Sequence, residues 1–176
     1  MMKEIDELTI KAAAKDQKGA FKRIYDHYAP FVWNVVYRTV RGDTDAAKEI
    51  MQDTFVKLHG SLNAFRFNAA FSTWLYRIAW NATMTHMAKR RRERERYVPL
   101  DPETPGPGRS GGFEAREAVS GILKKLTPEE RFLLVSREVQ GVSFEELAKI
   151  TGRKEGALRT RLHRIRGAVR KEVDYE

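Results

Sequence analysis

The chain contains no cysteine, which excludes disulfide bonds, thiolate metal sites and cysteine catalysis within it. Long apolar runs are also missing, so we expect no membrane-spanning helix. The first residues lack the pattern of a signal peptide, and we therefore expect a cytoplasmic protein with no membrane insertion. We expect no metal and no cofactor, because the four histidines lack the spacing of metal ligands; they are His27, His59, His86 and His163.

Signals for β-strands are nearly absent, because no alternating apolar run is bounded by hairpin turns. No nucleophile–base pair or phosphate-binding loop is recognisable, so we do not expect an enzyme. Charged residues, in contrast, are abundant and make up 32% of the chain's 176 residues. Its 33 Lys and Arg residues exceed its 24 Asp and Glu residues, giving a formal net charge of +9. This balance favours a polyanionic partner, either nucleic acid or an acidic membrane surface.

Proline and glycine are concentrated in residues 99–112, where they disfavour both helix and strand. On both sides of this segment, apolar residues recur at helical spacing. We therefore predict an all-α fold with two helical domains, at residues 1–96 and 117–176. A flexible linker at residues 97–116 is expected to join them.

Four successive helical segments are predicted in the first domain, the opening one being a helix or helix pair. Pro30 is expected in the first turn of the next helix, which Gly42 ends. Asp43 and Ser72 are expected to cap the third and fourth helices, because short polar side chains accept hydrogen bonds from free backbone N–H groups.

The third predicted helix has a polar, mainly acidic face opposite its apolar stripe. In a basic protein such a face would repel DNA, so we interpret it as a docking surface for a different partner. An ordinary solvated face is an equally good interpretation from spacing alone. The residues of this acidic face are Asp45, Glu49, Gln52 and Asp53.

An aromatic loop at residues 65–71 precedes the fourth predicted helix, which runs into an arginine-rich stretch. Aromatic rings beside arginines suit the unstacked bases of single-stranded nucleic acid. Alternatively, the aromatic residues pack in the core and the basic stretch is a solvated helix end. The candidate residues for this contact are Phe65, Asn68, Phe71, Trp74, Arg77, Asn81, Lys89 and Arg90.

Two capping boxes predict helix starts in the second domain, at Thr127 and Ser143. Gly141 and Gly152 suit the left-handed backbone found at helix ends. The helices are expected near residues 128–139, 144–150 and 154–171.

The last two of these helices, joined by a tight turn, form a predicted helix-turn-helix, which places its second helix in the major groove of DNA. One side of that helix is an apolar stripe of Leu158, Leu162, Ile165 and Val169. A solvated basic helix without base contacts is the alternative. The candidate DNA-binding residues are Arg153, Lys154, Arg159, Thr160, His163 and Arg164.

Together these motifs resemble those of the extracytoplasmic-function (ECF) sigma factors of bacterial RNA polymerase. Residues 45–59 are similar to their region 2.2, and residues 71–81 with the following arginines to regions 2.3 and 2.4. Residues 126–131 with the helix-turn-helix are similar to region 4. The resemblance implies a sigma factor that binds core RNA polymerase and directs promoter-specific transcription initiation, in a stress or envelope response.

The resemblance also implies partners and roles. The partners are core RNA polymerase, through the clamp helices and flap, promoter DNA, and an anti-sigma factor. The acidic face would dock on the clamp helices of the largest subunit. The loop at residues 65–71, with Asn81, would capture a flipped minus-10 base, while Trp74 and Arg77 would hold the melted strand. The recognition helix would read the minus-35 element.

Two other classes stay open on the residues alone. The first is a free-standing helix-turn-helix regulator that binds duplex DNA without polymerase. Such a regulator would not need the acidic face or the aromatic loop. The second is a nucleic-acid enzyme, such as a recombinase with a helix-turn-helix arm, which should show a catalytic constellation that we do not find.

Overall fold

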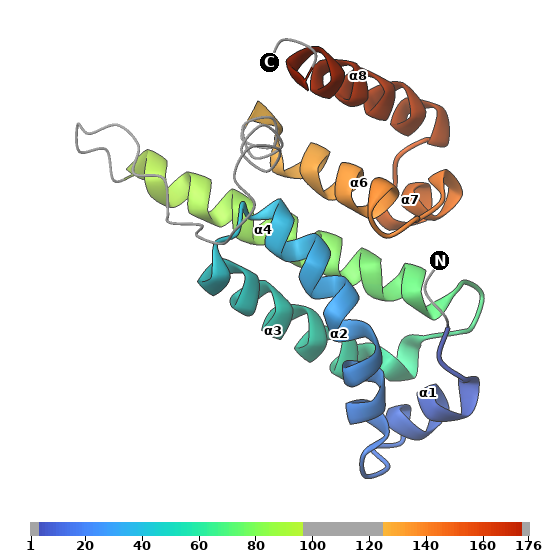
Figure 1. Ribbon diagram of the computed structural model, residues 1–176. Helices are drawn as coiled ribbons and strands as arrows, with labels where there is room; N and C mark the ends of the chain where they lie inside the picture. The colour runs from blue at the N-terminus through green and yellow to red at the C-terminus, as the bar shows by residue number, and fades with distance from the viewer. Residues whose placement is uncertain (1–3, 97–124, 174–176) are drawn as a thin grey trace.

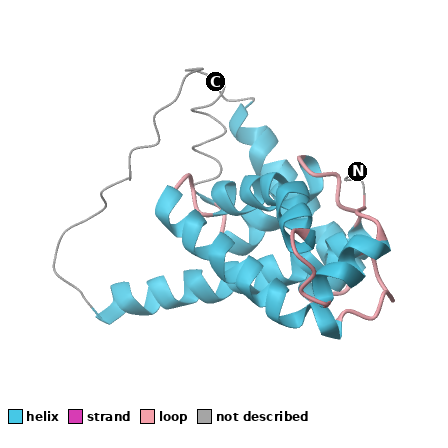
Figure 2. Ribbon diagram, turned by 90° about the horizontal axis from the view of Figure 1, so that it is seen from below, coloured by secondary structure: helices cyan, strands magenta, loops and turns pink. Residues whose placement is uncertain are grey.

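The computed structural model describes residues 4–96 and 125–173, and this part of the chain contains helices, turns and loops but no strand (Figures 1 and 2). The prediction of an all-α fold with two helical domains is confirmed, whereas the predicted linker at residues 97–116 lies outside the described residues. The N-terminal lobe, residues 4–96, contains α1 (Glu7–Ala14), α2 (Ala20–Thr39), α3 (Thr44–Ser61), the 3-10 helix η1 (Leu62–Ala64) and α4 (Phe71–Arg96). The C-terminal lobe, residues 125–173, contains α6 (Pro128–Glu138), α7 (Phe144–Thr151) and α8 (Glu155–Val173).

Most of the predicted helix ends are confirmed, because local side chains satisfy the backbone there. The carboxylate of Asp43 accepts a hydrogen bond from the backbone N–H of Ala46 at 3.0 Å and caps α3. Both capping boxes form, at Thr127 before α6 and at Ser143 before α7. Gly152 ends α7 with a backbone φ of 71°, a left-handed conformation that is strained for most residues other than glycine.

Two of the predicted helix starts are wrong. Pro30 lies inside α2, although its missing N–H removes one helical hydrogen bond. Its ring is exposed, and the buried side chains of Tyr28 and Val32 hold the helix to the core on either side of it. Helix α4 starts at Phe71, whose ring is buried, so Ser72 lies in the first turn instead of capping it.

The N-terminal lobe has an apolar core of its own, to which all four of its α-helices contribute. Its helices bury one face each, as the sequence spacing requires of amphipathic helices. Among the fully buried side chains of this core are Ile24, Tyr28, Val32, Ile50, Leu58 and Leu75.

The C-terminal lobe packs against α2 and α4 of the N-terminal lobe (Figure 1). Its core includes three residues of the other lobe, which are Val35, Tyr76 and Trp80. The rings of Trp80 and Phe132 meet edge to face, with their centroids 5.0 Å apart. Helix α8 lies on the far side of α6 and α7 from α4. The two lobes therefore share one apolar layer, and we call this arrangement the closed form.

The contact between the lobes also buries polar atoms that lack partners. The side chain of Arg131 is 2% exposed, and its Nε and Nη1 make no hydrogen bond with the described residues. Burial, with the nearby charge of Arg41, lowers the pKa of Arg131 to about 10. The hydroxyl of Tyr76 is buried without a partner among the described residues too, and burial raises its pKa. The closed form thus carries a desolvation cost that an all-apolar contact would not.

Candidate nucleic-acid and partner interfaces

The predicted acidic face lies on the outer side of α3, where Asp45, Glu49, Gln52 and Asp53 are all exposed. The opposite side of α3 is buried in the lobe core, so these four side chains have no structural role in packing. Glu49 lies 3.5 Å from Nδ1 of His86 on α4, whereas Asp45 and Asp53 make no ion pair within the described residues.

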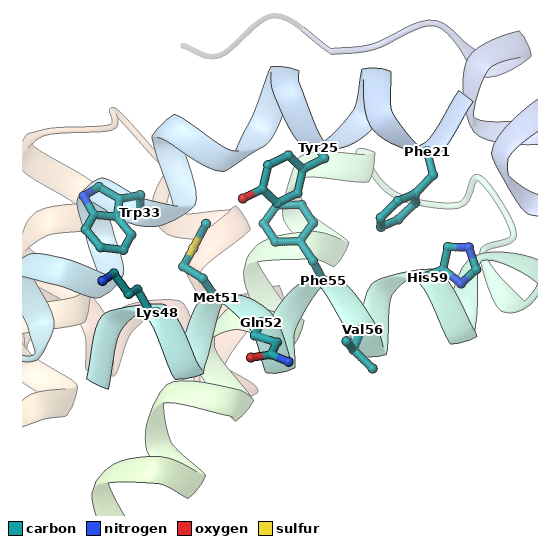
Figure 3. A pocket seen from close by; sticks show the side chains of 9 residues that line it. All are labelled: Phe21, Tyr25, Trp33, Lys48, Met51, Gln52, Phe55, Val56 and His59. Carbon is teal, nitrogen blue, oxygen red and sulfur yellow. The ribbon is translucent and has the colours of Figure 1, made fainter. Parts of the chain in front are cut away.

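An apolar groove of about 560 Å³ runs between α2 and α3, beside the acidic face (Figure 3). Gln52 belongs to both surfaces, because its side chain also lines the groove. The side chains of Tyr25 and Val56 remain 44% and 65% exposed there, so the groove presents apolar surface to solvent. Sequence reasoning missed this groove, although Val56 is an apolar residue on an otherwise polar helix face. Its lining consists of Phe21, Tyr25, Trp33, Lys48, Met51, Gln52, Phe55, Val56 and His59.

The aromatic loop between η1 and α4 is partly a core element. The rings of Phe65 and Phe71 are 9% and 2% exposed and meet edge to face at 5.2 Å between centroids. Half-buried Trp74 stacks on Phe65 at 5.0 Å. The role of direct base contact expected for Phe65 and Phe71 therefore needs correction, because buried rings anchor the loop and offer no free face.

The exposed residues of this loop are Arg66, Phe67, Asn68 and Ala70. Phe67 is 37% exposed and has φ of 56°, a left-handed backbone that is costly for an aromatic residue. Sequence reasoning did not single out Phe67, because no local signal separates it from the two buried phenylalanines beside it.

Along α4, Arg77, Asn81 and Lys89 are exposed, as expected of residues that contact nucleic acid. Arg90 is different, because its Nη1 donates to Oδ2 of Asp43 and ties the end of α4 to the cap of α3. The pKa of Asp43 is lowered by the N–H of Ala46 and then by Arg90. Arg90 is thus a bridge between two helices in this structure, and because its side chain is still 41% exposed, its contact with DNA stays a prediction.

The C-terminal lobe forms the predicted helix-turn-helix from α7, the turn at Gly152 and α8. Three members of the apolar stripe of α8 are buried, whereas the side chain of Val169 lies outside the described residues. All six candidate DNA-binding residues of this lobe are exposed: Arg153, Lys154, Arg159, Thr160, His163 and Arg164.

Several arginines near the turn and on α8 are paired with carboxylates of the same lobe. Arg153 pairs with Glu129 of α6, and Nη1 of Arg161 lies 2.8 Å from the same carboxylate. Arg159 pairs with Glu155 one turn before it. Lys154, His163 and Arg164 make no ion pair with the described residues, so they are the uncommitted polar groups of this surface.

No group of three or more His, Asp or Glu side chains in residues 4–96 and 125–173 could hold a metal ion. No helix in those ranges is both long and apolar enough to cross a membrane.

Two parts of the chain match known families. Residues 24–93 match sigma-70 region 2, and residues 116–169 match sigma-70 region 4. The chain belongs to the sigma-70 family. Helices α2 to α4 thus constitute region 2 of a sigma factor, and α6 to α8 constitute region 4.

Individual relatives are sigma factors of the ECF group. The chain is 29% identical over 181 residues to the ECF RNA polymerase sigma factor SigW of Bacillus subtilis, covering 93% of this chain and 94% of SigW. It is 29% identical over 183 residues to the ECF RNA polymerase sigma-E factor of Escherichia coli, covering 96% and 94%. The resemblance to ECF sigma factors is confirmed. This sigma factor binds core RNA polymerase and promoter DNA and directs promoter-specific initiation.

Solved structures show the same fold. CnrH, in complex with the cytosolic domain of CnrY, matches with a TM-score of 0.70 at 22% identity, over 97% of this chain and 98% of that one. The sigma factor RpoE of Bartonella quintana, in complex with the anti-sigma factor NepR, matches with a TM-score of 0.72 at 22% identity, over 89% and 98%.

Proposed function

We propose that this sigma factor holds core RNA polymerase through α3 and reads its promoter through α4, the loop before α4, and α8. The observation that carries the proposal is the acidic face of α3 beside an exposed apolar groove, on a protein whose formal net charge is +9. The acidic face disfavours a DNA contact on this side, because it would repel phosphates.

The two surfaces of α3 suit one protein partner. A basic helix of the polymerase clamp would gain Coulomb attraction from Asp53 and Glu49, while apolar side chains of the partner would fill the groove. Gln52 lies where the two surfaces meet and offers both a donor and an acceptor. Attraction at the rim with apolar burial at the centre is the usual anatomy of a specific protein interface.

The DNA contacts divide between the lobes. Exposed Asn68, Arg77 and Asn81 are our candidates for the melted minus-10 strand, joined by Phe67, whose partly free ring could stack on a base. Half-buried Trp74 supports the loop by stacking on Phe65. The exposed polar residues of α8 and of the turn before it are candidates for the minus-35 element, where arginine can bond two acceptors of a guanine.

We also propose an anti-sigma partner and a role in a stress or envelope response. A structure of similar fold contains the sigma factor RpoE bound to the anti-sigma factor NepR, which supports such a partner. A protein that works on core polymerase would act in the cytoplasm and by binding, with no catalytic step of its own.

The docking proposal is tested with the double variant Glu49→Arg, Asp53→Arg. Removing one member of a desolvated charge pair costs about 2–5 kcal/mol, so affinity for core polymerase should fall at least about thirtyfold. The variant should keep its helix content, because both side chains are exposed. The matched control is Glu7→Arg, an exposed acidic residue of α1 on the same lobe, which should bind polymerase normally.

Reconstituted transcription with core polymerase on a promoter library completes the test. The wild-type chain should direct polymerase to a restricted set of promoters, and the double variant should not. A folded double variant with unchanged polymerase affinity would refute the docking assignment.

A further inference from the structure

Arg159, our candidate base reader on α8, is held by two neighbours. Its Nε donates to Oε1 of Glu155 at 3.1 Å, and its Nη2 donates to the same oxygen. Its guanidinium carbon also lies 4.5 Å from the ring centroid of Phe144, the first residue of α7. The guanidinium of Arg137 lies 4.7 Å from the same centroid, and its Nη1 donates to the carbonyl of Val142 at 2.9 Å. Side chains of all three helices thus meet at one ring.

The hydrogen bonds leave one end of the Arg159 guanidinium available. Guanidinium has five N–H donors in a rigid fork, and Glu155 takes those along the edge formed by Nε and Nη2. Nη1 makes no hydrogen bond with the described residues. A guanine presents two acceptors, O6 and N7, which the terminal pair of nitrogens can meet together. Glu155 therefore occupies the edge of the guanidinium formed by Nε and Nη2, and the outer end of the group stays available for a ligand.

The ion pair between Arg159 and Glu155 adds little to the stability of the fold. The side chains of Arg159 and Glu155 are 60% and 42% exposed, and ion pairs with such exposure contribute little to folding. Glu155 lies in the first turn of α8, where a negative charge favours the helix dipole. On a helix that would enter the major groove, the same charge lies close to phosphates and works against DNA affinity, which a gain in selectivity would offset.

We propose that Glu155 and Phe144 are positioning residues that fix Arg159 for reading one guanine of the minus-35 element. The proposal rests on the proposed contact between Arg159 and a base. Glu155 thereby lowers general affinity for DNA and raises discrimination at a single base pair. A residue that served only the fold would change both quantities in the same direction.

The test uses the full-length sigma factor with core polymerase on promoters in which each minus-35 position is varied. Glu155→Ala should reduce discrimination at one position about tenfold, the lower range for a bidentate contact. The same variant, as free protein, should bind random duplex more tightly than wild type, because a carboxylate has gone. Glu155→Gln should retain much of the discrimination, because its amide oxygen still accepts from Nε of Arg159. Phe144→Leu should show a partial loss, since it keeps apolar packing without the aromatic face.

Glu145→Ala is the matched control. Glu145 forms the same kind of pair, one turn apart, with Lys149 of α7 at 2.7 Å. Its removal should leave base preference at every minus-35 position unchanged. A change equal to that of Glu155→Ala would mean that loss of any acidic charge suffices, and would overturn the positioning role.

Variants of Arg159 separate the two proposals. If Arg159→Ala changes no base preference, the proposed base contact itself is wrong. If Arg159→Ala relaxes one position and Glu155→Ala does not, the contact stands and the positioning role is refuted. The double variant should discriminate no worse at that position than Arg159→Ala alone; additive losses would show that Glu155 reads a base itself, which also overturns the proposal.

Discussion

The shared apolar layer between the lobes predicts that truncating one side chain opens the closed form. Trp80 of α4 is 7% exposed and touches Phe132 of α6, and it belongs to the layer shared with the C-terminal lobe. Truncating a buried aromatic residue to alanine costs about 3–5 kcal/mol. A loss of about 3 kcal/mol is a factor of roughly 150 in an equilibrium constant, so Trp80→Ala should shift the population strongly toward separated lobes.

Energy transfer between the lobes measures this change directly. Because the chain has no cysteine, Lys22→Cys on α2 and Ala168→Cys on α8 can carry the only two dyes. Both positions are exposed, so the labels should not disturb either core. Transfer efficiency should fall in Trp80→Ala, while the helix content seen by circular dichroism stays close to that of wild type.

Trp33→Ala is the matched control for this experiment. Trp33 is half-buried in the N-terminal lobe and stacks on Tyr37 with ring centroids 5.5 Å apart, away from the shared layer. Its truncation should destabilise the N-terminal lobe without changing transfer efficiency. Unchanged transfer in Trp80→Ala would refute the reasoning, and so would a loss of helix content, since that would place Trp80 in the core of its own lobe.

Two further predictions concern buried and capping charges. Arg131→Met should stabilise the closed form by about 1–3 kcal/mol, because an apolar chain replaces a buried guanidinium with unpaired donors; the denaturant concentration that abolishes energy transfer should rise. Asp43→Ala should lose the cap of α3, worth about 1 kcal/mol, together with the partner of Arg90. Because the pKa of Asp43 is lowered in the folded state, its negative charge stabilises the folded protein at pH values above the ordinary aspartate pKa of about 3.9. This stabilisation is lost as the pH falls below that value. The difference between wild type and variant in urea unfolding should therefore be larger at pH 7 than below about pH 3.9, and an equal difference at both would contradict the linkage.

Local interactions made much of the fold predictable. Both capping boxes, the cap at Asp43 and the glycine at position 152 act within a few residues of chain, so the sequence displays the whole interaction. Pro30 misled the prediction because its local cost is outweighed by burial of Tyr28 and Val32, which is a property of the folded lobe.

The candidate sites were predictable in part, for the same reason. The exposed positions of α3 and α8 follow from helical periodicity opposite an apolar stripe. Whether Phe65, Phe67 or Phe71 faces solvent depends on how the loop meets the core, and the three look alike in sequence. The groove beside α3 and the burial of Arg131 depend on packing between elements far apart in the chain, which no local pattern encodes.

The covering of Tyr76 and Trp80 by the C-terminal lobe has a consequence for competition. Both lobes belong to one chain, so the covering lobe meets this face of α4 at an effective concentration fixed by the connecting chain. Because closure is intramolecular, a higher concentration of the protein does not change the fraction of molecules in which the C-terminal lobe covers this face. A partner that needs the covered face must supply binding free energy beyond that of closure, and its apparent affinity falls by the fraction of open molecules. The amount of active sigma factor would then depend on the partner's own concentration and affinity as well as on the abundance of the chain.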